Sequence, residues 1–170
     1  GSAYSDAYGI SSSATTQVGV VSGAGRSLVD VTVGDIQTKS IGVSSVATTD
    51  VALIQGQGTV TETIVVGDIT NESYSISSKA LVHIGTVANG AGGSVTASIR
   101  AGNIHNEVGA AAGGKSFIYV GKIMAQNQGT SDIKISTGNL SWSIYAALGG
   151  LSGIEIGSVK SESGGRVTVS

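Results

Sequence analysis

His83 and His105 are the only histidines of the chain, and their spacing does not suggest a metal site. His83 lies between two apolar residues of an alternating strand, so we expect its side chain to point outward. His105 follows an apolar box, in an expected loop. A metal site needs three or four converging ligands, and no third ligand accompanies these two residues. The sequence predicts solvated histidines, no metal site and no cofactor.

The acidic residues are the other side chains suited to catalysis. Hydrolysis of a polysaccharide uses two carboxylates about 5–9.5 Å apart, and Ca²⁺ needs several carboxylates that converge with carbonyl oxygens. The 11 acidic residues are spread along the chain. We expect Asp35 and Asp68, which follow repeated glycines, to lie two coils apart, and no Asp/Glu pair to recur on adjacent coils. The spacing predicts that the protein is not an enzyme and disfavours a Ca²⁺ site.

Three aromatic residues are candidates for binding at the surface. Tyr119, Trp142 and Tyr145 belong to a chain with only one Trp, five Tyr and one Phe. Exposed Trp and Tyr side chains stack well on sugars and on partner subunits. The alternative is that Trp142 fills a wide part of the interior. Both interpretations remain open at the level of sequence.

The composition narrows the class of protein. Apolar residues make up 40% of the chain and charged residues 12%, with 27 glycines and neither proline nor cysteine. The abundance of Val, Ile and Thr indicates a single all-β unit. A net charge of −2 argues against a nucleic-acid partner. We also expect no membrane insertion, because no apolar run approaches the ~20 residues of a spanning helix.

A six-residue box recurs from residue 31 onward. Its form is apolar–x–apolar–Gly–x–apolar, as in residues 31–36 (VTVGDI) and 64–69 (IVVGDI). The alternation describes a strand with one buried face, and the glycine permits the backbone of a corner. A degenerate copy is expected at residues 53–58, inside the longest interval. The seven boxes contain Gly34, Gly67, Gly85, Gly102, Gly121, Gly138 and Gly157.

The period of the boxes predicts the fold. Repeats of about 18 residues with one recurring corner motif indicate a parallel β-helix, or β-solenoid, of about 18 residues per coil and about eight coils. Like residues of successive coils would stack at about 4.8 Å. The alternative is an antiparallel β-sandwich, which would need hairpin turns between its strands. Asn89-Gly90 is the single dipeptide of that kind.

The two ends of the chain differ from its middle. Residues 1–30 lack the box and are a cap, a degenerate first coil or an extended arm, whereas residues 31–170 form the expected solenoid. The final RVTVS is another alternating strand, and an uncovered strand edge recruits a partner strand. Either the next coil belongs to another subunit or the chain is cut from a longer one. In the first case we expect a head-to-tail junction formed by Tyr4, Tyr8, Val18, Val20, Val167 and Val169.

Short boxes of the repeat resemble two known groups. Residues 101–104 (AGNI) and 67–69 (GDI) resemble turns of filamentous-haemagglutinin-type secreted adhesins. Residues 82–85 (VHIG) are similar to boxes of the bactofilins, bacterial cytoskeletal solenoids that polymerise end to end. The resemblance extends over about residues 31–170. It implies a β-helical rod in the first case and a cytoplasmic homopolymer in the second.

The composition favours the secreted alternative. A chain rich in Ser, Thr and Gly and poor in charge is more typical of an extracellular fibre than of a cytoplasmic polymer. We expect a structural protein, a secreted or cell-surface subunit that assembles end to end into a fibre, sheath or biofilm-matrix filament. Its partner would be a second copy, with glycans or a host surface as further ligands. The alternatives are a monomeric adhesin rod or glycan-binding module, and a bactofilin-like cytoskeletal polymer.

Overall fold

The chain is a parallel β-solenoid. The computed structural model describes residues 1–19, 21–89, 94–126, 130–162 and 166–169. These residues form eighteen β-strands, and none of them belongs to a helix that could cross a membrane. Every strand pairing among them is parallel. The predicted solenoid is therefore confirmed, and the antiparallel sandwich is wrong.

The strands form three sheets, named A, B and C here. Sheet A contains β1 (Ala3–Tyr8), β5 (Ile36–Ile41), β8 (Ile69–Ser75), β11 (Ile104–Ala112) and β15 (Leu140–Leu148). Sheet B contains β2 (Ser13–Val18), β3 (Val21–Ala24), β6 (Val46–Gln57), β9 (Lys79–Asn89), β12 (Lys115–Val120), β13 (Ile123–Gln126), β16 (Leu151–Ile156) and β17 (Val159–Glu162). Sheet C contains β4 (Ser27–Val33), β7 (Thr59–Val66), β10 (Ser94–Ala101), β14 (Thr130–Thr137) and β18 (Arg166–Val169).

One coil takes about 35 residues, twice the predicted length. Ile36 pairs with Ile69, Ile69 with Ile104, and Ile104 with Leu140, which are offsets of 33, 35 and 36 residues. The strands of each sheet thus lie in five layers joined by four steps, or about four turns instead of eight coils. At about 4.8 Å per step, the stack is roughly 19 Å high. The predicted 18-residue period is half of a coil.

The box recurs because each coil has two corners of the same kind. One corner joins sheet C to sheet A and contains Gly34, Gly67, Gly102 and Gly138. The other lies within sheet B, where the residues have positive φ angles of 53–69°: Gly19, Ala52, Gly85, Gly121 and Gly157. Left-handed backbone of this kind turns a strand without ending its sheet. The box expected at residues 53–58 lies at residues 49–54, with Ala52 in the glycine position.

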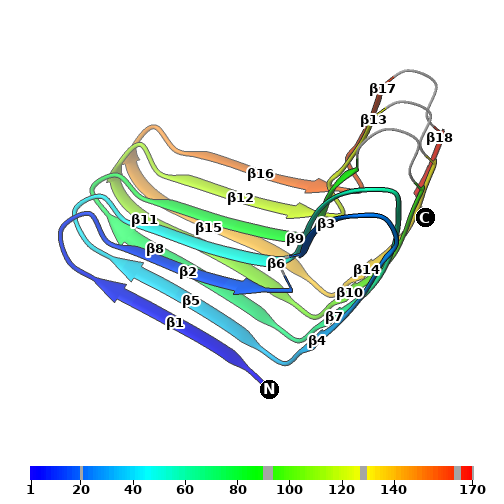
Figure 1. Cartoon of the computed structure of the whole chain (residues 1–170). Helices are drawn as coiled ribbons and strands as arrows, with labels where there is room; N and C mark the ends of the chain where they lie inside the picture. The colour runs from blue at the N-terminus through cyan, green and yellow to red at the C-terminus, as the bar shows by residue number, and fades with distance from the viewer. Residues whose placement is uncertain (20, 90–93, 127–129, 163–165, 170) are drawn as a thin grey trace.

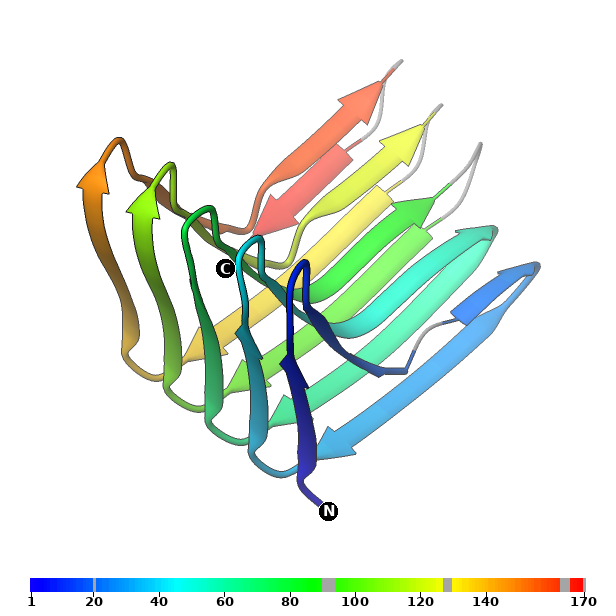
Figure 2. The same cartoon turned by 90° about the vertical axis from the view of Figure 1, so that its left-hand side faces the viewer.

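The two corners give each coil an L-shaped outline. Sheet A faces the first half of sheet B in one arm, and sheet C faces the second half of sheet B in the other (Figure 1). Figure 2 shows the strands of each sheet stacked along the coil axis. Sheet B therefore lines the concave side of the bend.

Aliphatic ladders fill the interior, as the alternation predicts. Ile64, Ile84 and Ile99 are at most 1% exposed, and each stands one or three residues before a box glycine. The arm between sheets A and B also contains a polar ladder. Asn71 Nδ2 donates to Asn106 Oδ1 at 2.8 Å, and Asn106 Nδ2 donates to Ser116 Oγ at 2.7 Å. Because these amides bond one another and nearby carbonyls, most of their burial is compensated.

The first thirty residues lie in the same stack. Strand β1 pairs with β5, β2 with β6, and β4 with β7, all in register. Strand β4 crosses the boundary that the sequence suggested at residue 30. The segment therefore has the arrangement of a first coil, and Gly19, with a φ angle of 69°, takes the sheet B corner position of this layer.

Candidate functional site

The concave face of sheet B brings together polar and aromatic side chains from all five layers. They stand two residues before the left-handed corner residue, and their neighbours on either side point inward. Strand alternation therefore turns them toward the hollow of the L. The column, in layer order, is Gln17, Asp50, His83, Tyr119 and Glu155.

An Asp–His pair lies at the centre of this column. His83 Nδ1 is 2.7 Å from Asp50 Oδ1, and Gln17 Nε2 donates to Asp50 Oδ2 at 3.2 Å. Burial opposes ionisation of Asp50, which is 7% exposed, but the hydrogen bonds from His83 and Gln17 outweigh it. They hold the pKa of the Asp50 carboxyl below its usual value. Since a carboxylate only accepts hydrogen bonds, Nδ1 of His83 is the protonated ring nitrogen.

Tyr119 extends the pair along the coil axis. Its ring stacks on His83 with centroids 5.1 Å apart, and Lys122 Nζ lies 4.8 Å from its centroid. The Lys122 ammonium forms no salt bridge within the described residues. Because His83 and Lys122 pack against the ring of Tyr119, a ligand in the hollow would meet the ring edge and the hydroxyl group more than a free ring face.

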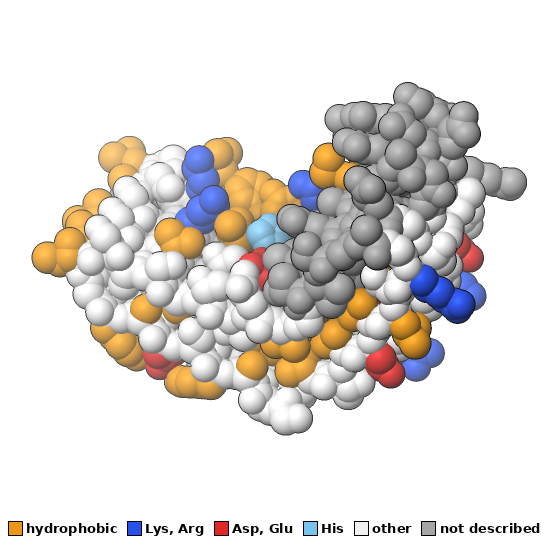
Figure 3. All heavy atoms as spheres, in the orientation of Figure 1, with side chains coloured by type: hydrophobic (Ala, Val, Ile, Leu, Met, Phe, Trp, Pro, Cys, Tyr) orange, Lys and Arg blue, Asp and Glu red, His pale blue; other side chains and the backbone are white. Residues whose placement is uncertain are grey.

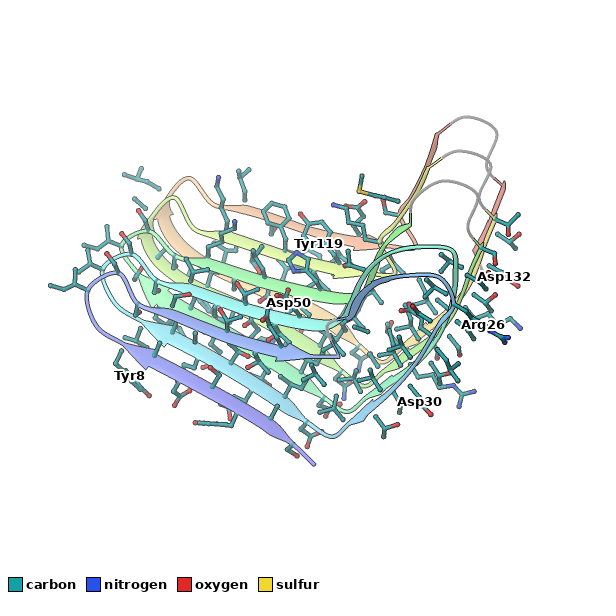
Figure 4. The ribbon with its side chains drawn as sticks, viewed as in Figure 1. Tyr8, Arg26, Asp30, Asp50, Tyr119 and Asp132 are labelled. Atoms are coloured by element: carbon teal, nitrogen blue, oxygen red, sulfur yellow. The ribbon has the colours of Figure 1, made fainter. Side chains whose placement is uncertain are left out.

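Asp50, His83 and Lys122 border an open groove of about 400 Å³. Figure 3 shows a histidine with hydrophobic and basic side chains beside it in the hollow, and Figure 4 shows Asp50 and Tyr119 on the sheet that lines it. A cation, a hydroxyl and an imidazole in a shallow groove suit a ligand with both negative charge and hydroxyl groups. The groove is lined by Thr48, Asp50, His83, Thr86, Lys122 and Met124.

The structure separates the three predicted surface aromatics. Tyr119 lies on the concave face of sheet B, next to the groove residues His83 and Lys122. Trp142 belongs to the inward column of Asn71 and Asn106 in sheet A, and it is 48% exposed because it lies in the outermost layer. Tyr145 points outward from the same strand, in the column of Tyr74. The three residues therefore form no common binding site.

The predicted junction residues lie at both ends of the stack. Tyr4 and Tyr8 are 67% exposed on the outer face of β1, and Val18 packs partly buried against the core. Val20 lies outside the described residues. The backbone of β18 pairs with β14, with Val167 opposite Ser131 and Val169 opposite Ile133. Tyr4 and Tyr8 thus point sideways from the first layer, not along the axis.

Two acidic residues do stack on adjacent coils, contrary to expectation. Glu72 and Glu107 are register partners on the outer face of sheet A. Glu72 pairs with Lys39 at 3.0 Å, and Glu107 accepts from the Tyr74 hydroxyl at 2.7 Å. The hydrogen bond from Tyr74 outweighs burial and, with one from His105, holds the pKa of the Glu107 carboxyl below its usual value. Both carboxylates are thus engaged in a surface network.

Asp35 and Asp68 lie one coil apart, not two, and serve a structural ladder. Asp35 Oδ1 accepts from the backbone N–H of Asp68 at 2.9 Å, and Asp68 Oδ1 accepts from that of Asn103 at 2.7 Å. The ladder continues from Asn103 to Asn139 at 3.0 Å. The described residues contain no group of three His, Asp or Glu side chains that could hold a metal ion. Both histidines, which the sequence predicted to be solvated, contact carboxylates. His83 lies against Asp50, and His105 Nε2 is 3.1 Å from Glu107 Oε2.

The chain is identified at the level of its fold class alone. The class, a parallel β-solenoid with three sheets per turn, follows from the strand pairing. No protein-family model, curated protein or solved structure matches the chain. The likeness to secreted adhesins and to bactofilins therefore rests on the short boxes of the repeat.

Proposed function

We propose that this chain is a structural protein whose coils stack end to end on those of further copies, so that successive subunits form one continuous fibre. A gradient of side-chain size along the inward columns supports this most directly. The column from Ala14 to Ser152 and the column from Val29 to Val169 keep their size. Five other inward columns, all in sheets A and B, end in layer 5 with a larger residue than they begin with in layer 1: Ala3 to Leu140, Ser5 to Trp142, Ala7 to Ile144, Thr16 to Ile154 and Val18 to Ile156.

Head-to-tail stacking matches large surfaces to small ones. Trp142 and Ile156 are each 48% exposed, whereas Asn106 and Val120, their neighbours one layer below, are fully buried. On the next copy, Trp142 would cover Ser5. Alternating large and small side chains fills such an interface without overlap, and each newly buried large apolar side chain adds about 1.5–3 kcal/mol. Head-to-head contact would instead oppose two large surfaces.

Assembly of the purified chain tests this proposal. Negative-stain electron microscopy and sedimentation over a range of concentrations should reveal filaments with an axial repeat of about 24 Å, which is five layers of about 4.8 Å. Trp142→Arg should abolish the filaments and leave folded β-rich particles that do not elongate. Leu28→Arg is the matched control, because Leu28 is 79% exposed on the outer face of β4 and points away from the junction. Discrete particles at every concentration would refute the proposal.

We place this fibre outside the cell or on its surface. The support is the low charge, the abundance of Ser, Thr and Gly, and the likeness of residues 101–104 to turns of secreted adhesins. A bactofilin-like polymer in the cytoplasm is the alternative. Fractionation of the source cells with an antibody to the folded chain distinguishes the two locations.

The groove of sheet B favours a second candidate function, the binding of an acidic polysaccharide. The observation behind it is the Lys122 ammonium, which has no carboxylate partner among the described residues and lies beside His83 and Tyr119. A polyuronate should bind more tightly than a neutral glucan, and salt should weaken it. Lys122→Ala should reduce the affinity about tenfold, whereas Lys134→Ala, an exposed change on sheet C, should not. Equal affinity for both polymers would exclude this function.

A further inference from the structure

An apolar side chain projects from the tip of the turn between sheets A and B in three successive layers. The turns read GISS at residues 9–12, GVSS at 42–45 and SISS at 75–78. Their apolar members Ile10, Val43 and Ile76 are 84%, 47% and 55% exposed. A turn tip needs no apolar residue for folding. An apolar residue nevertheless recurs at the turn tip in each of the first three layers, which indicates that another molecule covers this surface.

Further apolar side chains continue this edge of the molecule. Tyr8 is 67% exposed beside Ile10, and Tyr145 and Leu148 are 67% and 73% exposed in layer 5. In layer 4 the corresponding residue is the small Ala112, whose backbone N–H donates to the carbonyl of Ile76 at 2.9 Å. Figure 3 shows hydrophobic side chains along this edge, at its left. We call this surface the turn stripe.

The turn stripe is hollow at one end and raised at the other. A hollow of about 500 Å³ lies between the turns of layers 1–3. Leu148 and Tyr145 project at the opposite end of the stack. The hollow is lined by Gly9, Ile10, Ile41, Gly42, Val43, Tyr74, Ser75 and Ile76.

The area of the turn stripe is that of a protein interface. Fully exposed side chains of this size present roughly 150–200 Å² each, so the six exposed by 47–84% present on the order of 700 Å². One partner in a stable complex buries about 800 Å², and apolar patches on monomers are usually smaller. No charged residue occurs in the turns at residues 9–12, 42–45, 75–78, 111–114 and 147–150. An uncharged stripe fits another uncharged stripe.

We propose that the turn stripe is a lateral interface between two copies of this chain, related by a two-fold axis perpendicular to the coil axis. In this pair the raised end of each copy enters the hollow of the other. Ile76, in the middle layer, faces its own counterpart; Ile10 faces Leu148; and Val43 faces Ala112, large against small. A two-fold contact of this kind closes on itself. It is independent of end-to-end stacking, which uses the inward columns.

Engineered cysteines test the arrangement, since the chain has none of its own. Under mild oxidation Ile76→Cys should form a disulfide-linked dimer in high yield. In the Trp142→Arg background, which removes end-to-end contact, Ile10→Cys and Leu148→Cys should each form little disulfide alone but a linked pair when mixed. Leu28→Cys, on sheet C, is the control and should not cross-link, although Leu28 is more exposed than Ile76.

Two outcomes overturn the proposal. Cross-linking of Ile76→Cys no greater than that of Leu28→Cys would exclude the lateral pair. Self-cross-linking of Ile10→Cys that exceeds its linkage to Leu148→Cys would exclude the two-fold arrangement. Because Ile76 lies two layers, or about 10 Å, from either end of the stack, its disulfide does not report end-to-end contact. Adding Trp142→Arg to Ile76→Cys should remove filaments and leave the disulfide yield unchanged.

Discussion

Ala52 occupies the backbone conformation that glycine takes in the other four layers of the sheet B corner. Its φ angle is 53°, and those of its column neighbours Gly19 and Gly85 are 69° and 62°. A left-handed alanine costs about 1 kcal/mol or more relative to glycine. Its methyl group is fully buried in the core, which compensates part of that cost. At Gly85, by contrast, an added Cβ would meet Ile99 Cδ1 well inside van der Waals contact.

Alanine should therefore be tolerated at residue 52 of this corner but not at residue 85, one layer further along. We expect Gly85→Ala to lower the free energy of unfolding by about 2–4 kcal/mol, from left-handed strain and overpacking together. Ala52→Gly should stay within about 1 kcal/mol of the parent, because relief of strain offsets the loss of a buried methyl group. Urea unfolding followed by circular dichroism measures both. If Gly85→Ala lowers the free energy of unfolding no more than Ala52→Gly does, Ile99 must move aside to make room for the new methyl group.

Glu62 is the most isolated carboxyl of the described interior. It points inward from β7, is 1% exposed, and has no hydrogen-bond partner among the residues that the structure describes. Burial raises the pKa of Glu62 to about 8 from an ordinary 4.5. The folded protein therefore keeps this proton over a range of pH in which the unfolded chain has lost it.

Stability should consequently fall as the pH rises. The contribution of Glu62 is fully present below pH 4.5 and decreases by about 1.4 kcal/mol per unit until pH 8. Glu62→Gln should remove this slope and make the protein more stable than the parent at pH 7.5. Thermal unfolding at several pH values tests it, with the exposed Asp132→Asn as control. A parent and a Glu62→Gln variant with the same slope would contradict the assignment.

At the scale of elements, the corner between sheets C and A is held by side chains that bond the next layer. Asp68 accepts from the backbone of Asn103 at 2.7 Å and, more weakly, from its side-chain amide at 3.5 Å. Each rung thus satisfies a backbone N–H at a point where the strand ladder is interrupted. The ladder fixes the relative height of neighbouring coils.

Loss of one rung should be measurable. We expect Asp68→Ala to lower the free energy of unfolding by about 1–2 kcal/mol, because the backbone N–H of Asn103 loses a charged acceptor. Asp68→Asn keeps an acceptor in the same place and should cost much less. Asp30→Ala, an exposed change on β4, is the surface control. If Asp68→Ala behaves like Asp30→Ala, the rung adds nothing to stability.

The strand alternation was predictable from sequence, but the coil length was not. The two corners of a coil need the same short sequence: apolar residues on one face of a strand, followed by a residue that can adopt a bend. A box from one corner therefore aligns with a box from the other as well as with its own kind. A signal for the longer period was present. Asp or Asn follows Gly34, Gly67, Gly102 and Gly138, whereas Thr, Lys or Ser follows Gly85, Gly121 and Gly157. Only the first group forms the side-chain ladder.

The error in period also concealed the candidate site. Asp50, His83 and Tyr119 stand 33 and 36 residues apart and fall into one column only when a coil has about 35 residues. The box of Asp50 was missed because Ala52 replaces its glycine. The outward direction of His83 was predicted correctly from its apolar neighbours. Its bond to Asp50 depends on a contact across layers, which no local pattern encodes.

At the scale of the whole molecule, the three proposed contacts use surfaces that face in different directions. The inward columns of layers 1 and 5 face along the coil axis, the turn stripe faces sideways, and the groove of sheet B opens on the concave side. A fibre could therefore grow, pair and bind a polymer without one contact blocking another. Replacing Trp142, Ile76 or Lys122 should remove one of these three proposed contacts and leave the other two.

The L-shaped outline has a mechanical consequence. A single flat sheet is stiff in its own plane and bends easily out of it. Two arms joined along a common corner behave like an angle bar, in which each arm braces the other against bending in its weak direction. The brace depends on the corner that sheet B forms in every layer, and in two of the five layers β6 and β9 run through it as unbroken strands. A fibre of such coils would resist bending in both transverse directions for the same mass of protein.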